Sequence, residues 1–365
     1  MAKIRLEGLT KRFGSVVAVN ALDLEIQQGE LVAFLGPSGC GKTTTLRMVA
    51  GFEQPTAGTI FFNDKDITQL PPESRNTGMV FQNYALFPHM TVYGNVAFGL
   101  EMRKVAKEEI RTRVANILAK VQLSGLEERY PRQLSGGQQQ RTALARVLVL
   151  NPAVLLLDEP LANLDAKLRE EMRFYIRTLQ QEFGITTIYV THDQSEALVM
   201  ADRIAVMHNG VLQQLDEPEA IYRRPSSAWV ADFIGLSNLV PGHVRHREHD
   251  RIVVDTPAGA LVCLNSKGQV GQHHEEVLVC VRPESIHIYD GTAPLSNPGD
   301  SDQNRFSAVV HQRAYLGNLV DYRVRVTDKV TLRVQASPVR TYAEGEDVQL
   351  SFAAAEAWPI PKEGG

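Results

Sequence analysis

The first two thirds of the chain alternate between short apolar runs and stretches with helical spacing. The runs at 31–35, 153–157 and 185–190 are apolar almost throughout, as expected of strands that are buried on both faces of a sheet. Apolar residues recur at helical spacing between and after these runs, near 107–121, 138–150 and 163–181. Strands that alternate with helices predict an α/β domain built on a mostly parallel sheet.

The first thirty residues have a different spacing. Ile4 and Leu6 are two positions apart, and Leu22, Leu24 and Ile26 repeat the same period. A period of two predicts strands with one buried face. We therefore expect a few strands to precede the alternating region.

The pattern changes again near residues 233–242, beyond which helical spacing fades. The stretches 319–326 and 330–335 alternate between apolar and polar residues, and the turn-rich stretch 290–300 precedes them. This predicts an all-β domain over 236–365, resembling an OB-like barrel. The α/β domain is expected to occupy 1–235, with a helical subdomain at about 83–150.

Composition excludes several classes of protein. The chain has 365 residues, 44% of them hydrophobic, and a net charge of −4, so no overall basic field indicates nucleic acid. Three widely spaced cysteines form no disulfide framework and fit a reducing cytosol. No apolar run approaches the ~18 residues that span a membrane, and the N-terminus has no signal segment. Five histidines lie in polar sequence and predict solvated surface rather than a metal cluster: His243, His246, His249, His273 and His274.

The stretch GPSGCGKTT follows the apolar run at 31–35 and precedes a helical pattern. This context is that of a phosphate loop, in which glycines let backbone N–H groups surround phosphates and the following helix adds its free N–H groups. Lys42 is expected to reach the β- and γ-phosphates, Thr43 to bind Mg²⁺ and Thr44 to contact the α-phosphate. The expected nucleotide contacts here are Gly36, Ser38, Gly39, Cys40, Gly41, Lys42, Thr43 and Thr44.

Two acids, Asp158 and Glu159, end the apolar run at 153–157. The carboxyl ends of parallel strands are where α/β proteins bind ligands. One acid could hold Mg²⁺ and the next could orient and deprotonate an attacking water. The structural alternative is an acid that caps a helix. Beside a phosphate loop, the catalytic interpretation is favoured.

A second glycine-rich stretch, LSGGQ, lies at 134–138. Ser135 and Gln138 have the spacing of a capping box, so a helix is expected to begin here. Gly136 and Gly137 would leave backbone N–H groups open to an anion, although a plain glycine-rich N-cap is the alternative. A second anion site in a protein expected to bind one nucleotide suggests that two copies enclose the nucleotide between them.

Together, GPSGCGKT, VLLLDE and LSGGQ resemble the motifs of the ATPase subunit of an ATP-binding cassette (ABC) transporter. The remaining family motifs appear in order. By this resemblance, Phe13 stacks on adenine, Gln82 joins the Mg²⁺ site and senses the γ-phosphate, Asp165 is the acid of the D-loop, and His192 is the switch histidine. The family more often has tyrosine at Phe13 and serine at Ala162, which leaves the contact of the latter in doubt.

The resemblance implies a mechanism and partners. Two copies close head-to-tail on two ATP, so that Ser135, Gly136, Gly137 and Gln138 of one face the phosphates held by Lys42 of the other, and Glu159 acts as base. Residues 83–95 are expected to contact two integral-membrane permease subunits, although a buried helical subdomain would explain part of their apolar character. An extracytoplasmic substrate-binding protein is an indirect partner. The expected location is the cytoplasmic face of the inner membrane, as a peripheral protein.

VRPESIHI at 281–288 and AYLGN at 314–318 resemble the β-barrel regulatory domain of importer ATPases. This favours an importer of iron(III), polyamine or phosphonate, with sugar or sulfate as the alternative. A soluble cassette protein of DNA repair or translation is less expected, because the chain has one cassette and no sustained heptads. The same domain argues against an exporter. Region 240–365 lacks a basic strip with aromatic residues, so no nucleic acid is expected there.

Overall fold

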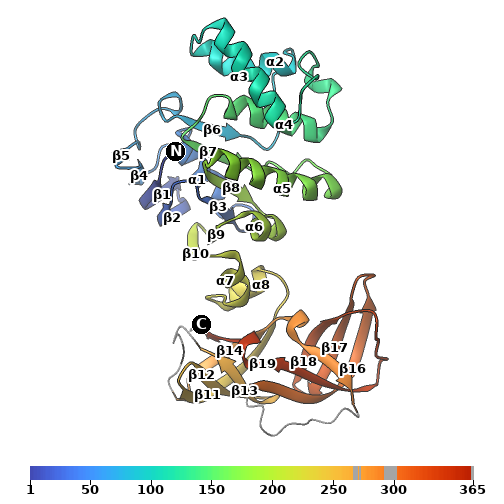
Figure 1. Cartoon of the computed structure of the whole chain (residues 1–365). Helices are drawn as coiled ribbons and strands as arrows, with labels where there is room; N and C mark the ends of the chain where they lie inside the picture. Colours follow the sequence, from blue (N-terminus) through green and yellow to red (C-terminus); the bar gives the residue numbers. More distant parts are fainter. Residues whose placement is uncertain (266–269, 271–272, 292–301, 363–365) are drawn as a thin grey trace. The chain divides into compact units, whose positions relative to one another are not determined.

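The computed structural model describes residues 1–265, 270, 273–291 and 302–362. The chain divides into two compact units, Met1–Pro218 and Glu219–Gly365. Figure 1 traces both units along the chain. Of the turn-rich stretch 290–300, all but the first two residues lie outside the described part.

A six-stranded sheet forms the centre of the first unit, in the order β10-β9-β3-β8-β7-β6. All its pairings are parallel except that of β9 with the edge strand β10. Every residue of β3, β7 and β8 is buried, which confirms the strands that the uniformly apolar runs predicted. The strands are β3 (Leu31–Leu35), β6 (Thr77–Val80), β7 (Val154–Asp158), β8 (Thr186–Thr191), β9 (Arg203–His208) and β10 (Val211–Asp216).

A second, antiparallel sheet of the first unit has the order β2-β1-β4-β5. Ile4 and Leu6 are buried, as are Leu22, Leu24 and Ile26, so the period of two marked the inner face correctly. These residues share one hydrophobic core with the central sheet. The strands are β1 (Ile4–Phe13), β2 (Val16–Ile26), β4 (Ala57–Phe62) and β5 (Lys65–Asp66).

Helices connect the strands of the first unit. α1 (Lys42–Ala50) follows the glycine-rich loop, α5 (Ala166–Phe183) follows β7, and α6 (Gln194–Met200) follows β8. Three further helices gather at one end of the unit (Figure 1) and pack through Val96, Val114 and Leu144. They are α2 (Val92–Met102), α3 (Lys107–Lys120) and α4 (Gly136–Leu148), with short 3₁₀ turns at Pro72–Ser74 and Pro131–Gln133.

The described strands of the second unit pair as two five-stranded sheets, β13-β12-β11-β14-β20 and β15-β19-β16-β17-β18. Both sheets contribute side chains to one core, and Val320, Tyr322 and Val324 point into it as their alternation predicted. The all-β class is confirmed. The strands are β11 (Asn238–Glu248), β12 (Arg251–Thr256), β13 (Gly259–Leu264), β14 (Glu276–Val281), β15 (His287–Asp290), β16 (Gln303–Tyr315), β17 (Val320–Thr327), β18 (Val330–Ala336), β19 (Asp347–Ala353) and β20 (Ala357–Pro361), with 3₁₀ turns at Pro283–Ser285 and Ala354–Glu356.

Two short helices, α7 (Pro218–Arg223) and α8 (Ala228–Phe233), precede the sheets of the second unit. The units divide at Pro218, earlier than the boundary at 235 that the sequence predicted. The buried Arg282 side chain explains the difference, because it donates to the carbonyls of Tyr222, Ala231 and Leu236. The Trp358 indole likewise donates to the Pro225 carbonyl at 3.1 Å. Both contacts bind the helical segment to the β-sheets.

Candidate nucleotide-binding site

The phosphate loop lies between β3 and α1, and its glycines are required by its shape. Gly39 and Gly41 have φ of 81° and 104°, a region that other residues rarely adopt. A Cβ at Gly36 would collide with the Met207 carbonyl and with the Cys40 sulfur, and one at Gly41 with the Ala18 carbonyl. The backbone therefore approaches its neighbours more closely than any larger residue allows. Ser38 and Gly39, at the turn of the loop, are exposed to solvent, and Thr44 is half-buried.

Lys42 points back into this loop. Its ammonium donates to the carbonyls of Gly36 at 2.7 Å and Pro37 at 2.9 Å, and the side chain is only 5% exposed. Among the described residues, no carboxylate forms an ion pair with it. A buried cation without an anion is costly, so the loop has the charge that a phosphate group would complement.

Thr43 and Asp158 are brought together from two motifs that are far apart in the chain. The Thr43 hydroxyl donates to Asp158 Oδ1 at 3.0 Å. Burial raises the pKa of the Asp158 carboxyl, and the Thr43 hydrogen bond opposes that effect. A hydroxyl and a carboxylate side by side are hard oxygen donors of the kind that Mg²⁺ prefers. The pair therefore fits the metal that the sequence predicted.

Glu159 and His192 also meet. Glu159 Oε1 lies 3.2 Å from His192 Nδ1, although the two residues directly follow different strands, β7 and β8. Glu159 has φ of 45°, which costs about 1–3 kcal/mol for a residue that is not glycine. Its N–H donates to the Val190 carbonyl at 3.0 Å and so holds this conformation against β8. The expected base and the expected switch histidine thus lie within hydrogen-bonding distance of each other.

The glycine-rich start of α4 forms the capping box that its spacing predicted. Ser135 Oγ accepts from the Gln138 N–H at 3.3 Å, and Gln138 Oε1 accepts from the Ser135 N–H at 3.0 Å. The Gly136 and Gly137 N–H groups belong to the first turn, where helices have no internal acceptor for them. The described contacts include none between this turn and Lys42 of the same chain.

Other predicted residues have varied surroundings. Phe13 ends β1 with its ring 49% exposed and the Lys11 ammonium 4.9 Å from the ring centroid, so a flat ligand can reach it. Asp165 caps α5 by accepting from the Leu168 N–H at 3.0 Å. The side chain of Gln82 is exposed, and the described hydrogen bonds do not join it to Thr43 or Asp158. Burial raises the pKa of the Cys40 thiol.

Two residues that sequence reasoning missed hold the segment around Gln82. Asn163 donates to the Gln82 carbonyl at 2.8 Å. Arg146, on α4, donates to the carbonyls of Tyr84 at 2.8 Å and Ala85 at 2.6 Å. Both contacts join positions more than sixty residues apart, so no local pattern could have indicated them.

The segment 83–95 is held from within by a buried amide. Asn95 accepts from the Phe87 N–H at 2.8 Å and donates to the carbonyls of Phe87 and Met90. Pro88 and His89, between these contacts, are exposed. The segment therefore presents a fixed loop to solvent.

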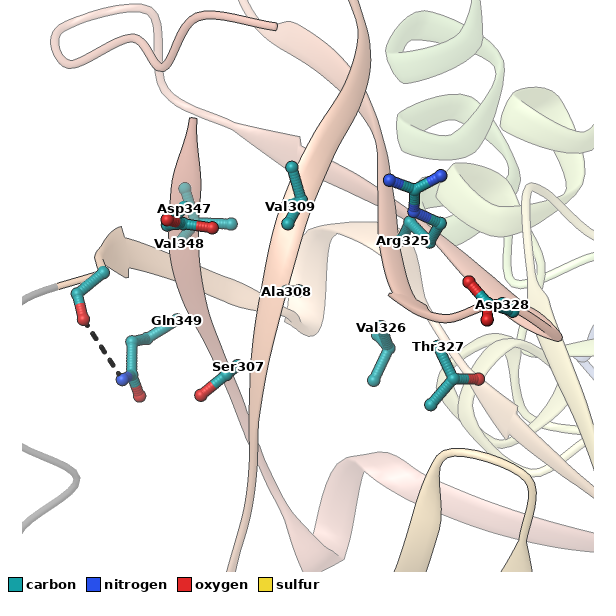
Figure 2. Close-up of a pocket in the computed structure, with 11 residues that line it drawn as sticks. Ser307, Ala308, Val309, Arg325, Val326, Thr327, Asp328, Asp347, Val348 and Gln349 are labelled. Carbon is teal, nitrogen blue, oxygen red and sulfur yellow. Dashed lines mark hydrogen bonds between the residues drawn. The ribbon is translucent and has the colours of Figure 1, made fainter. Parts of the chain in front are cut away.

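The second unit has a hollow of about 580 Å³ on the outer face of β16, β17 and β19, which Figure 2 shows. Val309 pairs with Arg325 on one side and Asp347 on the other, so a cation and an anion flank this valine. Asp328 adds a second carboxylate to the wall. The described lining residues include no aromatic ring. This balance of charge differs from the basic, aromatic groove that single-stranded nucleic acid requires.

The chain is similar to known proteins over nearly its whole length. The ABC transporter family profile matches residues 19–162, and the TOBE domain profile matches residues 279–360. A spermidine/putrescine import ATP-binding protein, PotA of Thermobifida fusca, is 46% identical over 98% of this chain and 93% of its own length. An Fe(3+) ions import ATP-binding protein, FbpC of Escherichia coli O157:H7, is 45% identical over 92% of this chain and 91% of its own.

Two solved structures are similar to part of the chain. cbiO1 of Clostridium perfringens, part of the cbiONQ ABC transporter complex, is 33% identical with a TM-score of 0.56 and covers 60% of this chain and 89% of its own. A dimer of the ATP-binding cassette MJ0796 bound to ADP and Pi is 32% identical with a TM-score of 0.53, over 59% of this chain and 98% of its own. Within the described residues, none of the helices is long and apolar enough to cross a membrane.

Proposed function

This chain belongs to the ABC transporter ATPases that energise import, and we propose that the phosphate loop and the acids that follow β7 form its hydrolytic site. The observation that carries the proposal is the Thr43–Asp158 hydrogen bond beside the buried Lys42, which points back into the phosphate loop. Lys42 binds the β- and γ-phosphates of ATP, and Phe13 stacks on its adenine. Thr43, Asp158 and, once it moves inward, Gln82 hold Mg²⁺, which neutralises phosphate charge when bound.

Glu159 orients and deprotonates the attacking water in this proposal. Its carboxylate ends a strand beside the phosphate loop and is held in an uncommon backbone conformation, which supports a positioned base. His192 lies within hydrogen-bonding distance of that carboxylate and senses the γ-phosphate. The remaining nucleotide contacts are those expected from the sequence: Gly36, Ser38, Gly39, Cys40, Gly41, Thr44 and Asp165.

The active unit is a homodimer of cassettes. The N–H groups of Gly136 and Gly137 are supported as the second half-site, because Ser135 and Gln138 cap each other and the hydrogen bonds of the described residues give those two groups no acceptor. The similar cassette that was solved as a dimer with ADP and Pi supports the same arrangement. Closure of two copies completes each site, so dimer geometry controls hydrolysis.

Residues 83–95 contact two integral-membrane permease subunits at the cytoplasmic face of the inner membrane, where the chain is peripheral. The fixed and exposed loop at Pro88 and His89 supports this contact, since a rigid surface transmits movement better than a mobile one. An extracytoplasmic binding protein delivers the cargo. A spermidine- or putrescine-type polyamine is the favoured cargo, because several similar proteins carry that name. Iron(III) is the second candidate, from a relative of nearly equal identity.

The test is to trap the closed dimer with Glu159→Gln, which is expected to bind ATP and hydrolyse it very slowly. The tagged variant is purified with Mg-ATP from gently solubilised cells, and co-purifying proteins are identified by mass spectrometry. Glu182→Gln, at an exposed position on α5, is the matched control and should keep hydrolysis. Recovery of multi-span membrane subunits supports the importer, and uptake of labelled spermidine against iron(III) then decides the cargo. Recovery of soluble proteins or nucleic acid alone would overturn the transport role and leave the hydrolytic site standing.

A further inference from the structure

The backbone around His192 is held by a side chain on each side of it. Thr191 Oγ1 donates to Glu196 Oε2 at 2.6 Å and accepts from the Asp193 N–H at 3.0 Å. The hydroxyl thus spans the histidine, because its two partners are a carboxylate on α6 and the backbone of the residue that follows His192. His192 itself is 59% exposed at the side chain and depends on this backbone for its position.

Glu196 determines the direction of the Thr191 hydroxyl. The Glu196 carboxylate is 4% exposed and accepts from the Tyr189 hydroxyl at 2.8 Å as well as from Thr191. Glu196 Oε2 is the acceptor of both hydroxyls, so the Thr191 hydrogen points to it and leaves a lone pair for the Asp193 N–H. Burial raises the pKa of Tyr189 far above its ordinary value, so the phenol remains a donor.

Asp193 fixes the other end of the same turn. Its carboxylate accepts from the Ser195 N–H at 2.8 Å and from the Glu196 N–H at 3.2 Å, which begins α6. Arg173 of α5 donates to its second oxygen at 3.1 Å. Burial alone would raise the pKa of Asp193, but the Ser195 and Glu196 hydrogen bonds and Arg173 together lower it, so the carboxylate stays ionised.

We propose that Thr191 and Glu196 are positioning residues for hydrolysis, which act by holding His192 within reach of Glu159 and of the γ-phosphate. The inference rests on the proposed role of His192. Both side chains are buried, so neither is exposed to a nucleotide. The hydroxyl–carboxylate pair transfers the rigidity of α6 to the backbone of the switch histidine, since Thr191 and Asp193 are its immediate neighbours. A purely structural role would stabilise the junction of β8 and α6 without changing turnover.

The closing experiment compares steady-state hydrolysis by the full-length chain. Thr191→Val removes the hydroxyl and keeps the shape of the side chain. It is expected to lower kcat by about ten- to hundredfold, because small misplacements of catalytic groups have effects of this size, while KM for ATP changes less than about twofold. Thr191→Ser restores the hydroxyl and should recover kcat to within about threefold of wild type. The matched control is Thr187→Val on the same strand, equally buried, whose hydroxyl donates to the Ile185 carbonyl.

A double variant separates positioning from general stability. If Thr191 acts through His192, adding Thr191→Val to His192→Ala should change kcat by less than about twofold. A further tenfold loss in the double variant, or a loss as large in Thr187→Val, would overturn the inference and indicate structural damage. Full activity of His192→Ala alone would instead overturn the proposed role of His192. Normal kcat in Thr191→Val with an inactive His192→Ala would reject only the positioning role.

Discussion

Replacing Arg146 with alanine should release the segment after Gln82 at a small cost in overall stability. The two guanidinium hydrogen bonds of Arg146 end on the carbonyls of Tyr84 and Ala85, which have φ of 60° and 46°. Neither residue is glycine. The arginine therefore holds two consecutive residues in a conformation that they would otherwise leave.

The magnitude follows from these two opposing terms. Two charge-assisted hydrogen bonds stabilise the native state by about 1.5–3 kcal/mol each. Two left-handed residues cost about 1–3 kcal/mol each. When Arg146→Ala removes the bonds, relaxation of the segment recovers most of the strain, so the net loss in the free energy of unfolding should be about 1–2 kcal/mol. Arg146→Lys should behave similarly, because an ammonium lacks the forked pair of donors.

Chymotrypsin provides the assay, since Tyr84, Phe87 and Tyr93 lie in the segment. Cleavage there, located by mass spectrometry, should accelerate at least about tenfold in Arg146→Ala, while the urea midpoint falls only slightly. Arg141→Ala on the same helix is the control, because that guanidinium donates to Gln122 at 2.7 Å and not to the segment. Protection equal to wild type would refute the reasoning. A collapse of the urea midpoint would show that Arg146 supports the whole subdomain rather than this segment.

Three further predictions concern single side chains. Asp158→Asn should raise the Tm of the nucleotide-free protein by about 2–4 °C at pH 7.5 and abolish Mg-ATP hydrolysis. Because burial raises the pKa of Asp158, the charged carboxylate destabilises the fold once the pH rises through that pKa, so the gain in Tm should vanish below the ordinary pKa of 3.8. An unchanged Tm at pH 7.5 would contradict this. Alkylation of Cys40 by iodoacetamide should abolish hydrolysis, and bound ATP should protect against it. Inactivation should be faster at pH 9 than at pH 7, because burial raises the pKa of the thiol. Full activity after stoichiometric labelling of Cys40 would reject this prediction. Arg282→Ala should lower the free energy of unfolding of the second unit, measured in urea, by more than about 3 kcal/mol, because it leaves several buried carbonyls without their donor. A loss below about 1 kcal/mol would contradict this prediction.

The parts of the fold and site that the sequence predicted well are those with local causes. The apolar runs predicted β3, β7 and β8 correctly, because a strand that is buried on both faces is apolar along its whole length. The capping box of Ser135 and Gln138 lies within one helical turn, so its spacing was sufficient. Gly39 and Gly41 adopt positive φ within the loop itself, so the motif was sufficient to predict them.

The parts that the sequence missed depend on contacts between distant positions. The left-handed conformation of Glu159 follows from its N–H reaching the Val190 carbonyl on the neighbouring strand. The hydrogen bond from Arg146 to the Tyr84 carbonyl joins residues that are separated in the chain by α2 and α3, so no local sequence pattern predicts it. The division of the units at Pro218 also rests on distant contacts, because carbonyls of the helical segment before residue 235 accept from Arg282.

That last feature bears on how chains of this kind can exchange parts. A chimera joined at residue 236 separates the Arg282 guanidinium from the Tyr222 and Ala231 carbonyls and leaves a buried cation facing a foreign backbone. One joined at residue 218 carries donor and acceptors together. Recombination between related genes is therefore tolerated on one side of α7 and penalised on the other. The part that can be exchanged is therefore the β-sheet domain together with the helices α7 and α8 that precede it.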